Sequence, residues 1–115
     1  MKNWTAPLPT PIPAGATPQL REALAAADKA CADAFATADK WWDAVMVPAD
    51  RLWLEASGGH AWREGLTDDR RAYVRTESAA IATWRESRSL AIKVRDGAIA
   101  AAYAAHYTAV SNQTK

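Results

Sequence analysis

The alternation of apolar and polar residues predicts two long helices joined by a short connection. Thr17 before Pro18 is typical of a helix start, because threonine caps well and proline is favoured at the first helical position. Small or apolar residues then recur at alternating spacings of four and three, as in a helix packed against a second helix. This predicted seam consists of Leu20, Leu24, Ala27, Cys31, Ala34, Ala38, Trp41 and Val45.

We expect this helix to end or kink at Pro48, because proline lacks an amide donor and its ring clashes with the preceding turn. Pro48 then begins a short second helix that ends at Ser57. The glycines that follow, Gly58 and Gly59, are typical of a helix C-terminus. Residues 48–66 together form the predicted connection between the two long helices.

The second long helix is predicted from about Asp68 to Val110. Thr67 supplies an N-cap, and the acidic residues that follow it complement the helix dipole. Gly97 is a weak point that costs about 1 kcal/mol relative to alanine. A bulky stripe falls on one side of this helix and is predicted to be its packed face. It comprises Val74, Ile81, Trp84, Ile92, Ile99, Tyr103, His106 and Val110.

The last part of this helix is unusually poor in charge. Between Ala98 and Thr114 the only side chain that is acidic or basic near neutral pH is His106, and alanine or aromatic residues lie on nearly every side. We therefore expect this stretch to be buried on more than one face. His106 itself is predicted to be a core or interface histidine whose ring nitrogens have hydrogen-bond partners.

Residues 1–17 are predicted to form an extended arm. Proline at every second position from Pro7 to Pro13 removes backbone donors and favours polyproline II. The predicted fold is therefore all-α: a long antiparallel helical hairpin with a short helical connection and an extended proline-rich N-terminal arm. Residues 18–115 are expected to form a single helical domain.

Length and charge exclude several classes of protein. The chain has 115 residues, one cysteine and a formal net charge of +1, which excludes a disulfide framework and a strongly basic nucleic-acid coater. No segment has the length and apolarity of a membrane span, and the start of the chain lacks the apolar run of a signal peptide. We expect a location in the cytoplasm or in an assembled particle such as a virion, without secretion by a signal peptide.

Charge is distributed unevenly along the chain. Residues 1–62 carry a net charge of −2 and residues 63–115 a net charge of +3. This asymmetry suits an antiparallel hairpin with an acidic first helix. We hypothesise that Arg88 and Arg95 pair with carboxylates of the first helix or of a symmetry mate.

Residues that carry chemistry are few. Two histidines stand 46 positions apart, outside any metal-binding spacing, and Cys31 is expected to be a buried thiol. His60 is the better placed of the two histidines for chemistry, but no catalytic partner accompanies it. We expect no enzyme activity, no cofactor and no metal.

The leading hypothesis is a non-enzymatic assembly subunit, such as a small structural or connector component of a phage virion. Its partners would be copies of itself, other protein subunits, or both. An alternative is a small inhibitor or adaptor that binds a host protein through a Trp-rich surface. Nucleic-acid binding ranks third, because acidic residues interrupt the arginines of the second long helix. The candidate partner-binding residues are Trp4, Leu8, Ile12, Trp53, Trp62, Trp84, Arg88 and Arg95.

Overall fold

A computed structural model of the chain describes residues 7–58 and 67–113 and consists of two long helices. Helix α1 spans Pro18–Ser57, and helix α2 spans Thr67–Gln113. The described residues form no strand. The prediction of an all-α helical hairpin is therefore confirmed.

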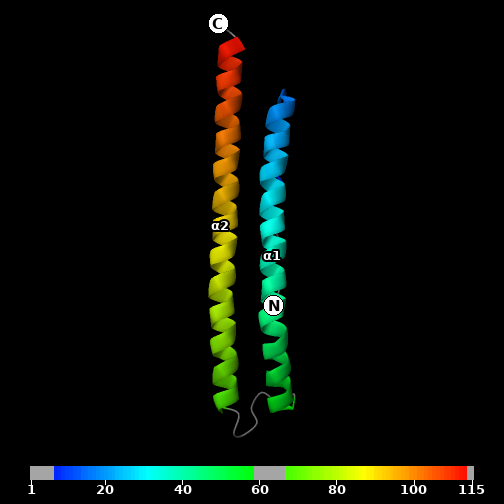
Figure 1. The fold of residues 1–115 in the computed structure, drawn as a ribbon, viewed down its shortest axis with the longest axis vertical. Coiled ribbons are helices and arrows are strands. Elements are labelled where there is room, and N and C mark those ends of the chain that lie inside the picture. Colours follow the sequence, from blue (N-terminus) through cyan, green and yellow to red (C-terminus); the bar gives the residue numbers. More distant parts are fainter. Residues whose placement is uncertain (1–6, 59–66, 114–115) are drawn as a thin grey trace. The chain divides into compact units, whose positions relative to one another are not determined.

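Two compact units can be distinguished by their internal contacts. The first combines residues up to Ala36 with those from Arg88 onward, and the second is Thr37–Ser87. Within each unit, a segment of α1 lies beside a segment of α2 that runs in the opposite direction (Figure 1). Each unit is therefore a short antiparallel helix pair.

The predicted start of α1 at Thr17 and Pro18, and the predicted glycine stop after Ser57, are confirmed by hydrogen bonds at the two ends of the helix. The backbone N–H of Leu20 donates to the Thr17 hydroxyl at 3.2 Å, the bond expected of an N-cap. At the other end, the Gly58 amide donates to the Leu54 carbonyl at 2.9 Å, with φ of +58° at Gly58. This left-handed conformation favours glycine and closes the helix.

The prediction that the first helix ends or kinks at Pro48, with a separate short helix after it, was wrong. Helix α1 continues through Pro48 to Ser57 without a break. Proline still costs the helix one backbone hydrogen bond. However, Pro48 and Ala44, whose carbonyl loses its donor, are both on the exposed side, where water can reach the carbonyl. Packing of Met46 and Trp53 on either side keeps the helix continuous.

The packed face of α1 differs from the predicted seam in its second half. Phe35 and Trp42 are buried, whereas Ala34 and Trp41 are exposed. The reason is the period: on a straight helix of 3.6 residues per turn, a strict seven-residue repeat drifts around the helix faster than an eleven-residue repeat of 3.67 residues per turn. Buried and half-buried positions follow this longer period at Leu20, Leu24, Ala27, Cys31, Phe35, Ala38, Trp42, Met46, Ala49, Trp53 and Ser57.

The same eleven-residue period governs α2. Of the predicted bulky stripe, only the two end residues Val74 and Val110 are exposed; Trp84 is buried, and the others are half-buried. Polar residues such as Glu77, Arg88 and Arg95 are half-buried as well, so the packed face is less apolar than the sequence pattern suggested. The buried and half-buried positions that follow the eleven-residue period are Tyr73, Glu77, Ala80, Trp84, Arg88, Ala91, Arg95, Ile99, Ala102 and His106.

The expectation that the end of α2 is buried on more than one face was wrong for the single chain. From residue 98 to 110, no residue of α2 is fully buried, and most are exposed. A hairpin offers each helix only one partner helix, so only one side of α2 is covered. The remaining alanine and aromatic surface faces solvent.

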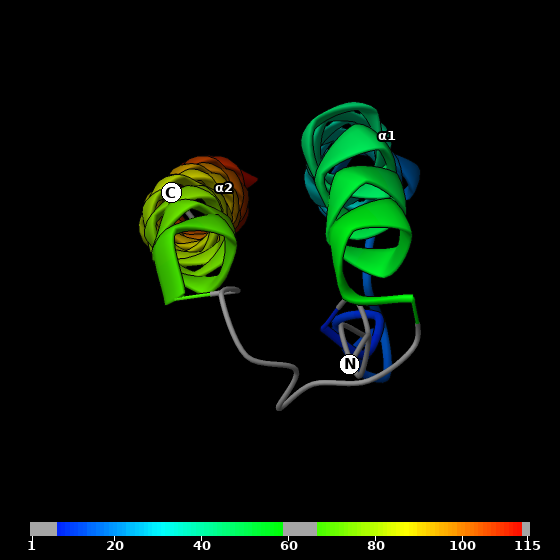
Figure 2. The same ribbon diagram turned by 90° about the horizontal axis from the view of Figure 1, so that it is seen from below.

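Residues 7–17 precede α1 and lie beside it (Figure 2). A turn closes with a 3.3 Å hydrogen bond from the Ala16 amide to the Pro13 carbonyl, and Gly15 has a φ of +77°. This positive φ is required at the third residue of a type II turn. Beyond the turn, the arm runs back along α1 as far as Asp28.

Candidate interaction site

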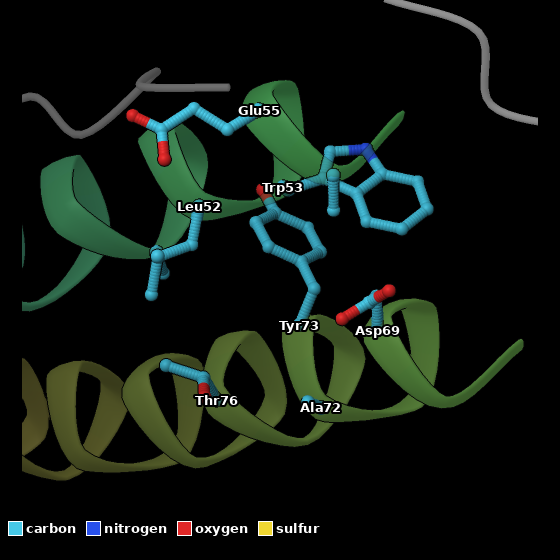
Figure 3. A pocket seen from close by; sticks show the side chains of 9 residues that line it. Leu52, Trp53, Glu55, Asp69, Ala72, Tyr73 and Thr76 are labelled. Atoms are coloured by element: carbon cyan, nitrogen blue, oxygen red, sulfur yellow. The ribbon is translucent and has the colours of Figure 1, made fainter. Parts of the chain in front are cut away.

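An aromatic cleft lies between α1 and α2 in the second unit. The Trp53 ring from α1 stacks on the Tyr73 ring from α2, with centroids 5.9 Å apart and planes at 28° (Figure 3). The cleft has a volume of about 490 Å³. It is lined by Ala49, Leu52, Trp53, Glu55, Ala56, Asp69, Ala72, Tyr73 and Thr76.

Tyr73 is held in place by carboxylates. Its hydroxyl donates a 2.7 Å hydrogen bond to Asp50 and approaches Glu77 at 3.4 Å. A phenol has one proton, so the shorter contact is the hydrogen bond and the longer one is at most a weak second interaction. The bond to Asp50 and the partial burial of the ring raise the pKa of Tyr73 well above its ordinary value.

The chemistry of this cleft is that of binding. A stacked aromatic pair with aliphatic neighbours can receive an apolar or aromatic side chain, and the rim carboxylates Glu55 and Asp69 add acidic groups. Trp53, a predicted partner-binding residue, is thus half-buried in the wall of a cleft. Its role in binding a partner stays a prediction.

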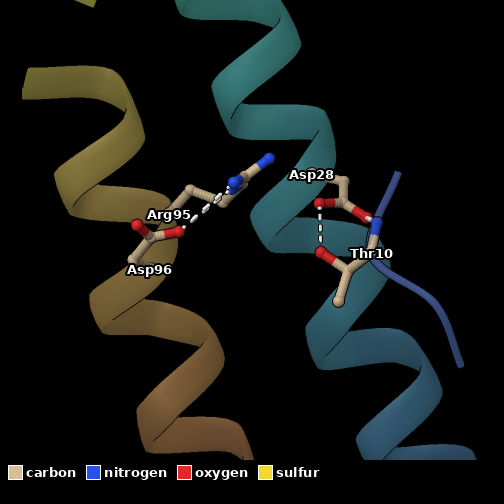
Figure 4. Close-up of polar contacts among 4 residues, drawn as sticks. All are labelled: Thr10, Asp28, Arg95 and Asp96. Atoms are coloured by element: carbon tan, nitrogen blue, oxygen red, sulfur yellow. Dashed lines mark hydrogen bonds and ion pairs between the residues drawn. The ribbon is translucent and has the colours of Figure 1, made fainter. Parts of the chain in front are cut away.

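The arm carries two further predicted partner-binding residues, Leu8 and Ile12, on its surface. Leu8 is 86% exposed and Ile12 is 51% exposed. Between them, Thr10 is tethered to Asp28 of α1 by its backbone amide and its hydroxyl, both at 2.8 Å (Figure 4). The arm is therefore anchored to its own helix at Thr10 while Leu8 and Ile12 remain accessible.

The two predicted arginines have contacts that the charge pattern did not foresee. The Arg88 guanidinium lies 5.5 Å from the centre of the buried Phe35 ring, within cation–π range. Arg95 is paired at 3.3 Å with Asp96, its neighbour on the same helix (Figure 4). Of these two contacts, the one between Arg88 and Phe35 joins α2 to α1.

The remaining predicted partner-binding residues fall in two groups. Trp84 is only 5% exposed and packs in the core of the second unit, so in this structure it is a structural side chain. Trp4 and Trp62 lie outside the described residues. Their roles as partner contacts stay predictions.

Reasoning from the sequence missed an uncharged face on α2 that includes Leu90 and Val94, each 61% exposed. The eleven-residue period was the signal that could have found it. The same period appears in α1 as the repeated triplets Ala27-Asp28-Lys29, Ala38-Asp39-Lys40 and Ala49-Asp50-Arg51. In each triplet, the alanine lies on the packed face of the helix.

Two residues weighed for chemistry have structural positions. Cys31 is a buried free thiol, as expected. His106 lies half-buried on α2, but its Nδ1 is buried without a hydrogen-bond partner among the described residues. Within the single chain, the expectation of a histidine whose ring nitrogens have partners is therefore not met at Nδ1.

Within residues 7–58 and 67–113, no three acidic, histidine or cysteine side chains gather where they could hold a metal ion. Neither helix in this part of the chain has a stretch long and apolar enough to cross a bilayer. Compared with known proteins, the chain matches no protein-family model, no curated protein and no solved structure at a significant level.

Proposed function

We propose that the chain is a non-enzymatic assembly subunit that binds copies of itself and neighbouring protein subunits. The observation that carries this proposal is the exposure of α2 from residue 98 to 110, a stretch of alanine and aromatic residues with no charged side chain. Contiguous exposed apolar surface in a soluble chain is characteristic of interaction sites.

The proposal extends to the kind of assembly. A tethered arm with exposed Leu8 and Ile12, beside a helical hairpin with an uncovered face, suits a small structural or connector component of a larger particle such as a phage virion. Such a component needs several contact surfaces and no catalytic site. Its arm, cleft and helix face would each bind a different neighbour.

Light scattering from micromolar to millimolar concentration tests the proposal. We expect the average mass to rise above the 12.5 kDa of the chain as concentration increases. Deleting residues 2–16 should weaken this association while helicity by circular dichroism stays the same, because the helices do not depend on the arm. A mass that stays monomeric over the whole range would contradict self-assembly.

The aromatic cleft favours a second candidate function, an adaptor or inhibitor that binds one heterologous protein. Stacked aromatic side chains are frequent hot spots of interfaces. This function predicts a stable monomer or dimer whose partner is lost on Trp53→Ala. Trp41→Ala, which changes a more exposed tryptophan outside the cleft, is the matched control and should leave the partner bound.

A further inference from the structure

An uncharged face runs along the exposed side of α2 within the first unit. It follows the eleven-residue period, displaced from the packed face, and all of its members are exposed. Leu90 and Val94 are its only large side chains. The face consists of Leu90, Val94, Gly97, Ala98, Ala101, Ala105, Thr108 and Ala109.

Gly97 has no role in the packing of its own chain. A Cβ added there would meet nothing within 4 Å, so the residue has no intrachain steric cause. Glycine inside a helix nevertheless costs about 1 kcal/mol relative to alanine. Glycine here would be explained if a second backbone approached this face closely, because glycine has no side chain to block the approach.

The face is complementary in shape to the same face of a second copy of α2 that runs antiparallel to the first. If two copies of α2 run antiparallel about a two-fold axis between Gly97 and Ala98, Leu90 of one copy meets Ala105 of the other. Val94 then meets Ala101, so each large side chain faces a small one. Large residues packed against small ones are what close helix packing requires, and a two-fold axis repeats both contacts.

Charge distribution selects the antiparallel direction. The charged part of α2 ends at Asp96, and no acidic or basic residue other than His106 follows before the end of the helix. An antiparallel pair places Lys93 and Asp96 beside the uncharged end of the second copy. A parallel pair would instead set Lys93 level with Lys93 of the second copy, and Asp96 level with its equivalent, which is unfavourable.

We propose that a second copy of this chain docks on the Leu90–Ala109 face of α2, antiparallel and centred between Gly97 and Ala98. The inference rests on the proposed function and names one of its contacts. About this axis the segment Leu90–Ala105 pairs with its own equivalent, and it is about 24 Å long at 1.5 Å per residue. An interface of this size belongs to the weak class, below roughly 1,200 Å² of buried surface, so the dimer forms at high concentration or within an assembly.

Cysteine cross-linking tests the axis directly. In a Cys31→Ala background, single substitutions Leu90→Cys, Ala98→Cys and Ala105→Cys are oxidised at high protein concentration. The axis separates the two copies of residue 98 by about 1.5 Å along the helix, and those of residues 90 and 105 by about 22 Å. We expect a disulfide-linked dimer from Ala98→Cys alone. Equal yields at all three positions, or none at residue 98, would overturn the proposal.

A charge substitution provides the second measurement. Leu90→Glu should lower the association constant at least tenfold, because it places a carboxylate against Ala105 of the other copy. Ala82→Glu is the matched control: it adds the same charge at an exposed position of α2 outside both the face and residues 98–110, and it should leave association unchanged. Circular dichroism confirms that both variants remain helical. Equal association of Leu90→Glu and the unsubstituted chain would overturn the proposal.

The two proposals fail differently. If the mass of the unsubstituted chain rises with concentration but residue 98 does not cross-link, this interface is wrong and the assembly function stands. If the unsubstituted chain stays monomeric up to millimolar concentration, this interface and self-assembly are both contradicted.

Discussion

The hydroxyl of Tyr73 on α2 donates a 2.7 Å hydrogen bond to Asp50 on α1. This bond and the stacking of Tyr73 on Trp53 join the two helices of the second unit at the aromatic cleft. Asp50 belongs to the eleven-residue repeat of α1 and Tyr73 to that of α2. The register of the two helices therefore brings this pair together.

Removing this hydrogen bond should destabilise the chain modestly. Tyr73→Phe keeps the stacked ring, and because the site is partly exposed we expect a loss of about 0.5–1 kcal/mol in the free energy of unfolding by urea. Tyr103→Phe, which alters a tyrosine outside the cleft, is the control and should have a smaller effect. If Tyr73→Phe and Tyr103→Phe lost equal free energy of unfolding, the hydrogen bond would not stabilise the chain.

The same bond makes stability depend on pH on the alkaline side. Because the folded-state pKa of Tyr73 is raised above its ordinary value near 10, the stabilisation is complete below that value. It is lost as pH rises further and the phenol ionises. Spectrophotometric titration should show one of the three tyrosines ionising later than the others, and Asp50→Asn should lower its pKa. Unchanged ionisation in Asp50→Asn would refute this cause.

Close approach of the helices should make one alanine intolerant of a larger side chain. Ala80 is 2% exposed, whereas its neighbour Ala79 is exposed. Ala80→Leu should cost about 1–3 kcal/mol in thermal or chemical unfolding, because the added atoms have no space. Ala79→Leu should change stability little. Similar results for the two variants would mean that the helices are not packed closely at Ala80.

Pro48 should limit the stability of α1. Because the helix passes through this residue without an amide donor, Pro48→Ala should stabilise the chain by about 1–3 kcal/mol. The corresponding positions one and two periods earlier are Thr37 and Ala26, which shows that the repeat accepts other residues here. Unfolding experiments that show no gain would indicate that the helix ends before Pro48.

His106 should be replaceable by an apolar residue. Its Nδ1 is buried without a partner, so His106→Leu should raise the free energy of unfolding by about 1 kcal/mol. His106→Gln, which retains polar atoms, is the control and should give no gain. A loss of stability in His106→Leu would show that the ring nitrogen has a partner in solution.

The sequence predicted the two helices, the residues that cap α1 and the apolar core of α1 up to Cys31. It misplaced the core beyond Cys31 because seven-residue and eleven-residue repeats coincide over the first turns and separate only from Phe35 onward. The predicted helix end at Pro48 relied on the low helix propensity of proline. The packing of Met46 and Trp53 overrides this propensity. The stacking of Trp53 on Tyr73 depends on the register between helices, which a single helical pattern does not specify.

The central claim is that the apolar end of α2, exposed in one chain, is covered when chains assemble. Amide hydrogen exchange of residues 98–110, measured at micromolar and at millimolar concentration, tests it directly. We predict that exchange in this segment slows markedly at the higher concentration while exchange in residues 67–76 changes little. Identical exchange of residues 98–110 at both concentrations would contradict the claim.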